Sequence, residues 1–268
     1  MQIQSFLKRI IKKILNFFGW RLVKNAPKPT LMKENLKLDY IKSIIDSNGI
    51  FHIGAHRGSE APIYYWLGKD VIWIEAIPKI YEDLKNNIYN FSNQKAYNYL
   101  ITNNDNEQKN FFISNNDGAS SSIYEFGDYH NNFDSRKFKM TNKIKLNTTT
   151  LETFLIKENI DLKDYNFWTI DVQGAELEVL KSAKNFIKFC KYLYIEISMK
   201  EFYKGGVQFD ELNTWLNQKG FEISWDPKDV HTNVLYKKIR SMRIAGGAND
   251  ILRLSISKGV FEFGSGIL

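Results

Sequence analysis

The stretch Phe51-His-Ile-Gly-Ala-His-Arg-Gly58, followed by Val71-Ile-Trp-Ile-Glu75, decides the fold. It gives an apolar run, a glycine turn, room for a helix, and a second apolar run that ends in an acid. This order is typical of a parallel α/β sheet that holds a nucleoside. Gly54 permits a tight turn, and a Cβ at Gly58 would collide with a closely bound ligand. Glu75 stands at the carboxyl end of the second strand, where its carboxylate can accept hydrogen bonds from both hydroxyls of a ribose.

The spacing of the glycines indicates which nucleoside binds. A dinucleotide-binding turn reads G-x-G-x-x-G, and its middle glycine lies against a pyrophosphate. His56 occupies that position here, and its side chain would fill the space. The sequence also lacks the G-x-x-x-x-G-K-[ST] phosphate loop. The pattern therefore favours S-adenosylmethionine, a nucleoside without a pyrophosphate, while a structural turn that binds no ligand stays open.

The composition indicates one globular domain with appendages. The chain has 268 residues, 43% of them hydrophobic, which is enough for a large core. Cys190 is the single cysteine, so an intramolecular disulfide and a C-x-x-C metal site are excluded. We expect it to be a packing residue in a reducing compartment.

The positive charge is confined to the N-terminus. Residues 1–28 hold seven lysines and arginines and no acid, which equals the whole net charge of +7. The remaining residues carry 30 basic and 30 acidic side chains and are neutral as a group. A neutral body argues against a nucleic acid partner, because such partners are held by basic surfaces.

Residues 3–18 form a predicted amphipathic helix within a basic N-terminal region, residues 1–25. Apolar residues recur there at helical spacing, and basic residues flank them. Such a helix can lie in an anionic membrane surface; it is too short and too charged to span one, and it lacks the uncharged run of a signal peptide. Packing on the body or on a second subunit is the alternative. Residues 26–47 are expected to form a proline-containing linker and a lead-in helix.

Alternating strands and helices over residues 48–240 predict a mainly parallel sheet with right-handed crossovers. The predicted strands are 50–53, 71–75, 96–102 with 109–114 as a hairpin partner, 144–147, 167–170, 192–197, and a final antiparallel pair at 221–225 and 234–238. The predicted helices are 36–46, 60–67, 79–89, 151–158, 174–189 and 209–219. Ligands bind at the carboxyl ends of such strands, where Glu75 and Asp171 lie. Residues 241–268 are a tail without an assigned element or role.

Residues 115–147 differ from the rest of this domain. A turn with three serines is followed by a polar and aromatic run. A long irregular stretch in a compact domain is usually functional or disordered, and the aromatic residues argue against disorder. We expect a lid or acceptor-binding loop.

The chain resembles the FkbM family of S-adenosylmethionine-dependent methyltransferases over roughly residues 48–240. The motifs that carry the resemblance are Phe51 to Gly58, Ile74-Glu-Ala-Ile-Pro78, Ala119-Ser-Ser-Ser122, Thr148-Thr-Thr-Leu-Glu-Thr-Phe154, Ile170-Asp-Val-Gln-Gly-Ala-Glu-Leu-Glu-Val-Leu180, Tyr194-Ile-Glu-Ile-Ser198 and Gly220-Phe221. The resemblance implies a Rossmann-like, seven-stranded class I methyltransferase sheet with helices on both faces. It also implies methyl transfer from S-adenosylmethionine, usually to a hydroxyl.

The resemblance assigns roles to individual residues. Gly54, Ala55, His56 and Gly58 would face the methionine part and the ribose of the cofactor, Glu75 would hold the ribose hydroxyls, Ala76 and Ile77 would flank the adenine, and Asp171 would lie near the sulfonium and the acceptor. One position departs from the pattern, because His52 stands where related methyltransferases carry an acid. Glu60 is a candidate substitute for that acid.

Methyl transfer to an alcohol requires alignment of the acceptor and removal of its proton. Asp171 is the favoured base because it ends a core strand at the cofactor edge, and His130 in the lid is a second candidate, with His56 and Glu176 as further acids or bases. Asp171 as a helix cap or as a ligand of the cofactor amine is the alternative. No dense carboxylate cluster is visible in the sequence, so we predict no metal.

We therefore expect a cytoplasmic O-methyltransferase that acts on a hydroxyl of a sugar, a glycan or a similar small molecule. The basic amphipathic helix suggests a peripheral position on the inner face of the membrane. Two alternatives stay open: a nicotinamide-dependent oxidoreductase, and a non-enzymatic membrane-associated binding module.

Overall fold

The computed structural model describes residues 34–134 and 136–239. The chain divides into two units, Met1–Ile45 and Asp46–Leu268. Helix α2 (Glu34–Asp46) confirms the predicted lead-in helix. The predicted amphipathic helix at 3–18 and the tail at 241–268 lie outside the described residues.

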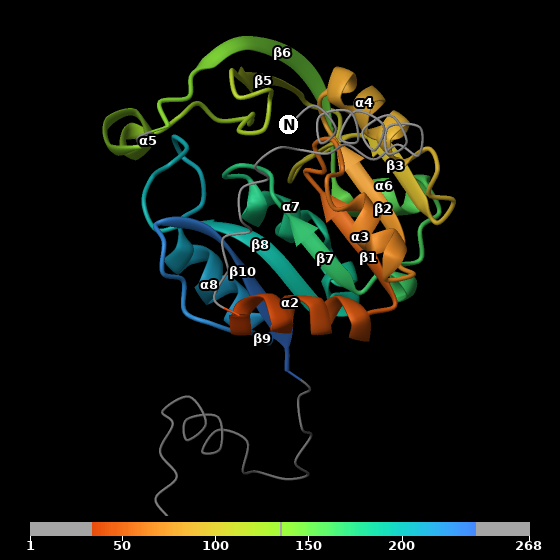
Figure 1. Cartoon of the computed structure of the whole chain (residues 1–268). Coiled ribbons are helices and arrows are strands. Elements are labelled where there is room, and N and C mark those ends of the chain that lie inside the picture. The colour runs from red at the N-terminus through yellow and green to blue at the C-terminus, as the bar shows by residue number, and fades with distance from the viewer. Residues whose placement is uncertain (1–33, 135, 240–268) are drawn as a thin grey trace, which may run out of the picture. The chain divides into compact units, whose positions relative to one another are not determined.

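The second unit is built on a seven-stranded sheet in the order β3-β2-β1-β7-β8-β10-β9 (Figure 1). The strands are β3 (Gln94–Asn98), β2 (Asp70–Glu75), β1 (Gly49–Ile53), β7 (Phe167–Ile170), β8 (Tyr192–Ser198), β10 (His231–Lys238) and β9 (Phe221–Ile223). The first five pair in parallel, and β10 runs antiparallel to both of its neighbours. Chain order reverses direction at β1 and β7, which is where a ligand cleft forms in a doubly wound sheet. The predicted α/β class and the final antiparallel pair are confirmed.

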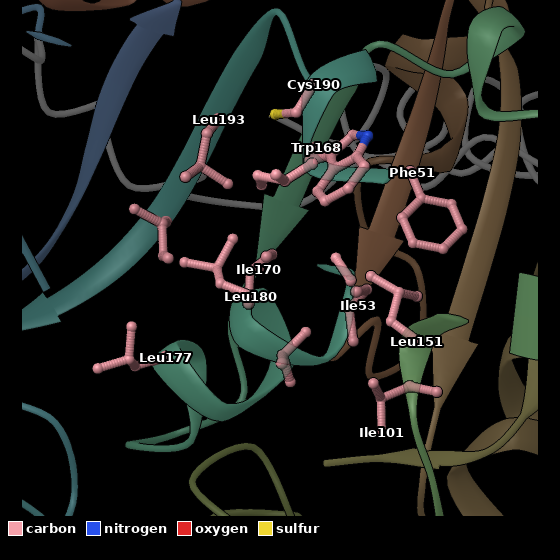
Figure 2. Close-up of a cluster of buried hydrophobic side chains, with 14 of the residues drawn as sticks. Phe51, Ile53, Ile101, Leu151, Trp168, Ile170, Leu177, Leu180, Cys190 and Leu193 are labelled. Carbon is pink, nitrogen blue, oxygen red and sulfur yellow. The ribbon is translucent and has the colours of Figure 1, made fainter. Parts of the chain in front are cut away.

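The central strands are recognisable in the sequence because the sheet is covered on both faces. Every residue of β1 and β7 is buried, which gives the continuous apolar runs expected of parallel strands. Phe51 packs against Trp168 on the neighbouring strand, with ring centroids 5.7 Å apart. Figure 2 shows both rings in one cluster with Leu151, Leu180 and other apolar side chains.

Helices cover the two faces of the sheet, as predicted. On one face Phe51 meets Phe154 of α6 (Leu151–Lys157), with ring centroids 6.2 Å apart. His52 points to the other face, since side chains alternate along a strand, and lies 6.3 Å from Tyr64 of α3 (Ala61–Trp66). The remaining helices among the described residues of this unit are α4 (Pro78–Ile88), α5 (Asp128–Phe133), α7 (Glu176–Ser182), α8 (Phe209–Gln218) and the 3₁₀ turns η1 (Leu162–Asp164) and η2 (Lys184–Phe189).

Cys190 lies in the same apolar cluster and is fully buried (Figure 2). Burial raises the pKa of its thiol well above the ordinary value. The predicted role as a packing residue is confirmed.

The prediction of one strand over 96–102 was wrong. β3 ends at Asn98, and β4 (Leu100–Ile101) belongs to a second, three-stranded sheet in the order β4-β6-β5. In it β5 (Gln108–Ser114) pairs antiparallel with β6 (Met140–Thr149), not with the third strand. Thr141, Asn142 and Lys143 near the start of β6 are polar and exposed, so no alternating apolar pattern marked them as strand. The final part of the predicted lid is therefore a β-strand.

Candidate active site

A cleft lies at the carboxyl edge of β1, β2 and β7, the edge at which parallel sheets bind ligands. The residues that line it are Ile53, Gly54, His56, Ile74, Glu75, Ala76, Ile77, Tyr99, Leu100, Ile101, Phe111, Gly118, Ala119, Ser121, Ile123, Asp171, Val172, Gln173 and Ala175. Six of the eight predicted cofactor residues are among them: Gly54, His56, Glu75, Ala76, Ile77 and Asp171. The cavity volume is about 60 Å³, so the cleft is narrow in this structure.

The backbone that follows β7 lies so close to the glycine turn that position 54 has no space for a side chain. Gly54 has φ +80°, and a Cβ there would lie 1.8 Å from the carbonyl oxygen of Asp171. The backbone nitrogens of Gly54 and Ala55 both donate to the carbonyl of Ile74 at 3.0 Å. The turn thus fastens the ends of three strands together, and only glycine leaves the space that this requires.

Glu75 is held as a fixed acceptor at the end of β2. Its Oε2 accepts a hydrogen bond from the backbone nitrogen of His56 and its Oε1 accepts one from that of Ile77, both at 2.8 Å. The residue is 6% exposed, and burial raises its pKa to about 7 although the backbone donors oppose the rise. Each carboxylate oxygen keeps lone-pair capacity for a further donor, so the group can accept from a diol.

An apolar wall stands beside Glu75. Ile77, Leu100 and Phe111 form one buried cluster, and Ile123 packs against it. These side chains suit a flat, weakly polar ring such as adenine. Sequence reasoning found Ile77 and missed the others, because they come from the second sheet and the loop after it.

The serine turn at the start of the predicted lid forms another wall. Gly118, Ala119 and Ser121 line the cleft. Arg57 binds the carboxylate of Asp117 and, through Nε at 2.9 Å, that of Asp83 on α4. This arginine therefore ties the glycine turn, α4 and the wall loop together.

Asp171 follows β7 directly and faces a group of acids. Its backbone nitrogen donates to the carbonyl of Ile53 at 3.0 Å, and Gln173 Nε2 donates to its Oδ1. Burial, followed by the charge of Glu196, raises the pKa of Asp171 to about 8. A carboxylate with such a pKa is half ionised at about pH 8, and a pKa shifted in this way is a property of catalytic acids and bases.

The alternative that Asp171 caps the following helix is not supported. Helix α7 begins after Ala175, which makes no side-chain cap. Glu176 closes the turn instead, because its carboxylate accepts hydrogen bonds from the backbone nitrogens of Val172 and Gly174 at 3.1–3.2 Å. Glu176 is thus a buried first-turn acid, and burial raises its pKa to about 8.

A Ser–His–Glu arrangement lies next to Asp171, and the sequence did not predict that these three side chains come together. His231 Nε2 is 2.9 Å from Glu196 Oε1, and its Nδ1 is 2.7 Å from Ser198 Oγ. The imidazole stacks on Phe202 at 4.1 Å between centroids. β10 runs back beside β8, which brings His231 to this edge from far along the chain. The alternating polar residues Tyr194, Glu196 and Ser198 in an otherwise apolar strand were the available signal.

Two predicted cofactor residues do not line the cleft. A Cβ on Gly58 would meet Leu84 Cδ1 of α4 at 2.6 Å, so its close approach is to a helix and not to a ligand. Ala55 is buried, and its carbonyl accepts a hydrogen bond from the nitrogen of Gly58 at 2.9 Å. Both residues therefore shape the glycine turn without lining the cleft.

His130, the second predicted base, is also outside the cleft. It is 1% exposed and stacks on Phe126 with centroids 3.7 Å apart. Its Nε2 is 2.9 Å from the carbonyl of Phe138 and its Nδ1 is 2.9 Å from Asp134 Oδ2. The ring is buried inside the lid, away from the cleft, so we correct its predicted catalytic role to a structural one.

His52 takes no part in the cleft. It is buried, stacks on Trp73 at 4.8 Å, and burial lowers its pKa to about 4. The imidazole is therefore neutral at physiological pH and serves packing. Within residues 34–134 and 136–239, no group of three His, Cys, Asp or Glu side chains is placed to hold a metal ion. Over the same residues, no helix has the length and apolarity needed to cross a bilayer.

A model of the methyltransferase FkbM domain matches residues 52–223, which is more than half of the chain. The chain belongs to the FkbM methyltransferase family. It is accordingly an S-adenosylmethionine-dependent methyltransferase, and the alternatives of an oxidoreductase and of a non-enzymatic module are not supported. None of the curated proteins matches the sequence significantly.

Several solved structures are distantly similar to this FkbM-family chain. A putative RNA methyltransferase from Pyrococcus horikoshii has 13% identity, with 78% of this chain and 82% of that chain covered and a TM-score of 0.38. The human methyltransferase 10 domain-containing protein has 14% identity, coverage of 87% and 96%, and a TM-score of 0.40. A putative caffeoyl-CoA O-methyltransferase from Staphylococcus aureus has 14% identity, coverage of 85% and 91%, and a TM-score of 0.41.

The cleft of this FkbM methyltransferase has the hydrogen-bond acceptors and the apolar wall that S-adenosylmethionine needs. Glu75 offers two fixed carboxylate oxygens, the turn at Gly54 leaves room at the strand ends, and an apolar wall lies alongside. Pockets for ligands of this size usually exceed about 300 Å³, so binding has to widen the cleft.

Proposed function

We propose that this FkbM methyltransferase methylates a hydroxyl of a sugar, a glycan or a similar small molecule. The observation that carries the proposal is Asp171, a carboxylate that lines the cofactor cleft and whose pKa lies at about 8. An alcohol has to lose a proton when it is methylated, and a base poised near the working pH serves this step best.

The chain's own residues divide the work of holding the cofactor. Glu75 would accept the two ribose hydroxyls, and Ala76 and Ile77 with the apolar wall would enclose the adenine. Gly54 and His56 would lie along the ribose and the methionine part. When bound, S-adenosylmethionine supplies an electrophilic methyl group whose bond to sulfur breaks, leaving the electron pair on sulfur, as the bond to the acceptor oxygen forms.

Asp171 would take the proton that leaves the acceptor oxygen. Its ionised fraction grows as the pH rises through about 8, so activity should rise over the same range. Such a base contributes a factor of about 10²–10⁴, and alignment in the narrow cleft contributes the remainder of the rate enhancement. His231 and Glu196 form a neighbouring pair, and their charges would act on the proton transfer to Asp171.

The N-terminal residues motivate a membrane-side acceptor. The basic segment 3–18, outside the described residues, suits an anionic surface on the inner face of a membrane. The neutral charge of the rest of the chain favours a glycan or a lipid-linked sugar over a nucleic acid. A cytoplasmic, peripherally bound enzyme would fit both features.

A screen with radiolabelled S-adenosylmethionine tests the proposal. Purified full-length protein is offered cell-surface glycans, lipid-linked sugars and total RNA in parallel, with Asp171→Asn as the matched variant. We expect label in a sugar fraction, stable to alkali as a methyl ether is, and a loss of about 10²–10⁴ in the variant. Label in RNA alone, or equal turnover by the variant, would contradict the proposal.

A further inference from the structure

Gln173 lies where two acids of the sheet edge approach each other. Its amide nitrogen donates to Asp171 Oδ1 and to Glu196 Oε2, the latter at 2.9 Å. An amide nitrogen carries two protons, so this pair of bonds uses both. The side chain therefore bridges the end of β7 to the neighbouring strand β8.

Tyr203 fixes which way this amide points. Its hydroxyl donates to Gln173 Oε1, and the residue is 2% exposed. Two glycines make room for it, since a Cβ on Gly174 or on Gly206 would lie 3.0 Å from Cβ of Tyr203. With the oxygen held by the hydroxyl, the nitrogen has to face the carboxylates. The opposite orientation would place the amide oxygen against two acids.

The backbone of Gln173 has a strained conformation. Its φ is +58°, a region that non-glycine residues seldom adopt. Such conformations persist where the surroundings over-determine them, and they cluster at active sites. Here the surroundings are Ser122, whose Oγ donates to the carbonyl of Gln173 at 2.6 Å, and Glu176, which binds the next backbone nitrogen.

We propose that Gln173 is a positioning residue that orients the carboxylate of Asp171 and favours its ionised form by bridging it to Glu196. The role of Asp171 as a base rests on the proposed function. The bridge from Asp171 to Glu196 does not depend on that function. Removal of the amide donors leaves Asp171 in the cleft and makes its ionisation less favourable.

The groups around Asp171 explain why an amide is suited to this role. The titratable groups that act on it or respond to it are Glu196 and Tyr194 of β8, Glu176 of α7, His231 of β10, Glu60 before α3, and Tyr203. The acids among them disfavour a further negative charge. A lysine or arginine would offset them but would repel a sulfonium cation. A neutral donor stabilises the carboxylate without that repulsion.

The direct test is the titration of Asp171 in the protein without cofactor. Carboxyl ¹³C NMR on protein labelled in its aspartate side chains gives the midpoint, and the resonance is assigned as the one lost in Asp171→Asn. Gln173→Met removes the donors and keeps the side-chain volume similar. We expect its midpoint to rise by about one pH unit, with a smaller rise in Tyr203→Phe. Gln218→Glu, an exposed change on α8, is the matched control and should leave the midpoint unchanged.

An unmoved midpoint in folded Gln173→Met would overturn the proposal. If that variant does not fold, Tyr203→Phe decides, because it leaves Gln173 in place and frees only its orientation; an unmoved midpoint there overturns the proposal equally. Calorimetry with S-adenosylmethionine and S-adenosylhomocysteine between pH 6.5 and 9 gives a second measure. In the wild type, the affinity for S-adenosylmethionine relative to that for S-adenosylhomocysteine should rise roughly three- to tenfold as the pH rises. In Gln173→Met the same rise should occur at a higher pH. Failure of both ligands to bind the wild type would contradict the cofactor assignment alone, since the NMR titration uses neither.

Discussion

Asp171→Asn should make the folded protein more stable, and the gain should grow with pH. The folded protein holds a proton on Asp171 up to a pKa of about 8, whereas the ordinary value is 3.8. Between these values the folded state binds more protons than the unfolded state, so the wild type loses stability as the pH rises. Asparagine does not titrate, and its side-chain oxygen can still accept from Gln173.

The magnitude follows from the width of this window. One bound proton changes the free energy of unfolding by about 1.4 kcal/mol per pH unit, and the window from pH 5 to pH 8 covers about three units. This gives roughly 4 kcal/mol. Part of the Asp171 side chain faces the cleft, where water screens its charge, so we expect about 2–4 kcal/mol.

Urea unfolding followed by tryptophan fluorescence measures this difference at pH 5 and at pH 8.5. Trp73 and Trp168 are fully buried and should report global unfolding. Comparison with the wild type at each pH removes the titration of the groups that do not interact with Asp171. Asp226→Asn, an exposed change, is the control and should show no trend. A stability difference between Asp171→Asn and wild type that stays constant with pH would refute the reasoning.

Three further predictions concern the turn, the wall loop and the N-terminus. Gly54→Ala should lower the free energy of unfolding by more than about 3 kcal/mol in urea or prevent folding, because its Cβ would meet a carbonyl oxygen. Gly68→Ala, with a similar φ but open space, should lower it by about 1 kcal/mol, and equal losses would contradict this. Arg57→Ala removes the ion pair between the glycine turn and the wall loop and leaves the contact of His56 Nε2 with the carbonyl of Asp117, so it should loosen the loop. Stopped-flow rates of S-adenosylhomocysteine association and dissociation should then both rise about two- to fivefold; unchanged rates would show that this ion pair does not gate the cleft. Deletion of residues 1–25 should release the protein from anionic vesicles without changing its affinity for S-adenosylhomocysteine; undiminished vesicle binding would remove the membrane assignment.

The parts of the fold that the sequence predicts are those with a strong local signal. β1 and β7 are buried on both faces, so they appear as unbroken apolar runs bounded by turns. β6 has one exposed side and polar residues at its start, so its first half was assigned to a lid. The apolar wall of the cleft was missed for the same reason, since it depends on the second sheet.

The residues of the site also divide into those that the sequence predicts and those that it does not. Gly54 and Glu75 were found because their positions relative to strand ends determine their roles. A glycine at positive φ signals a close approach without saying what approaches, and for Gly58 the neighbour is α4. The bridge from Asp171 through Gln173 to Glu196 depends on strand order, and His231 joins it from an antiparallel strand. No spacing in the sequence contains that information.

The central claim is that Glu75 holds the ribose of an adenosyl cofactor at the glycine turn. Calorimetric titration of S-adenosylhomocysteine into wild type and Glu75→Gln tests it most directly, with Glu82→Gln, an exposed change on α4, as the control. Charge-assisted hydrogen bonds contribute about 1.5–3 kcal/mol, so we predict one binding site whose affinity falls roughly 10- to 100-fold in Glu75→Gln and not in the control. Equal affinity of the folded Glu75→Gln variant and the wild type, or no binding to the wild type, would contradict the claim.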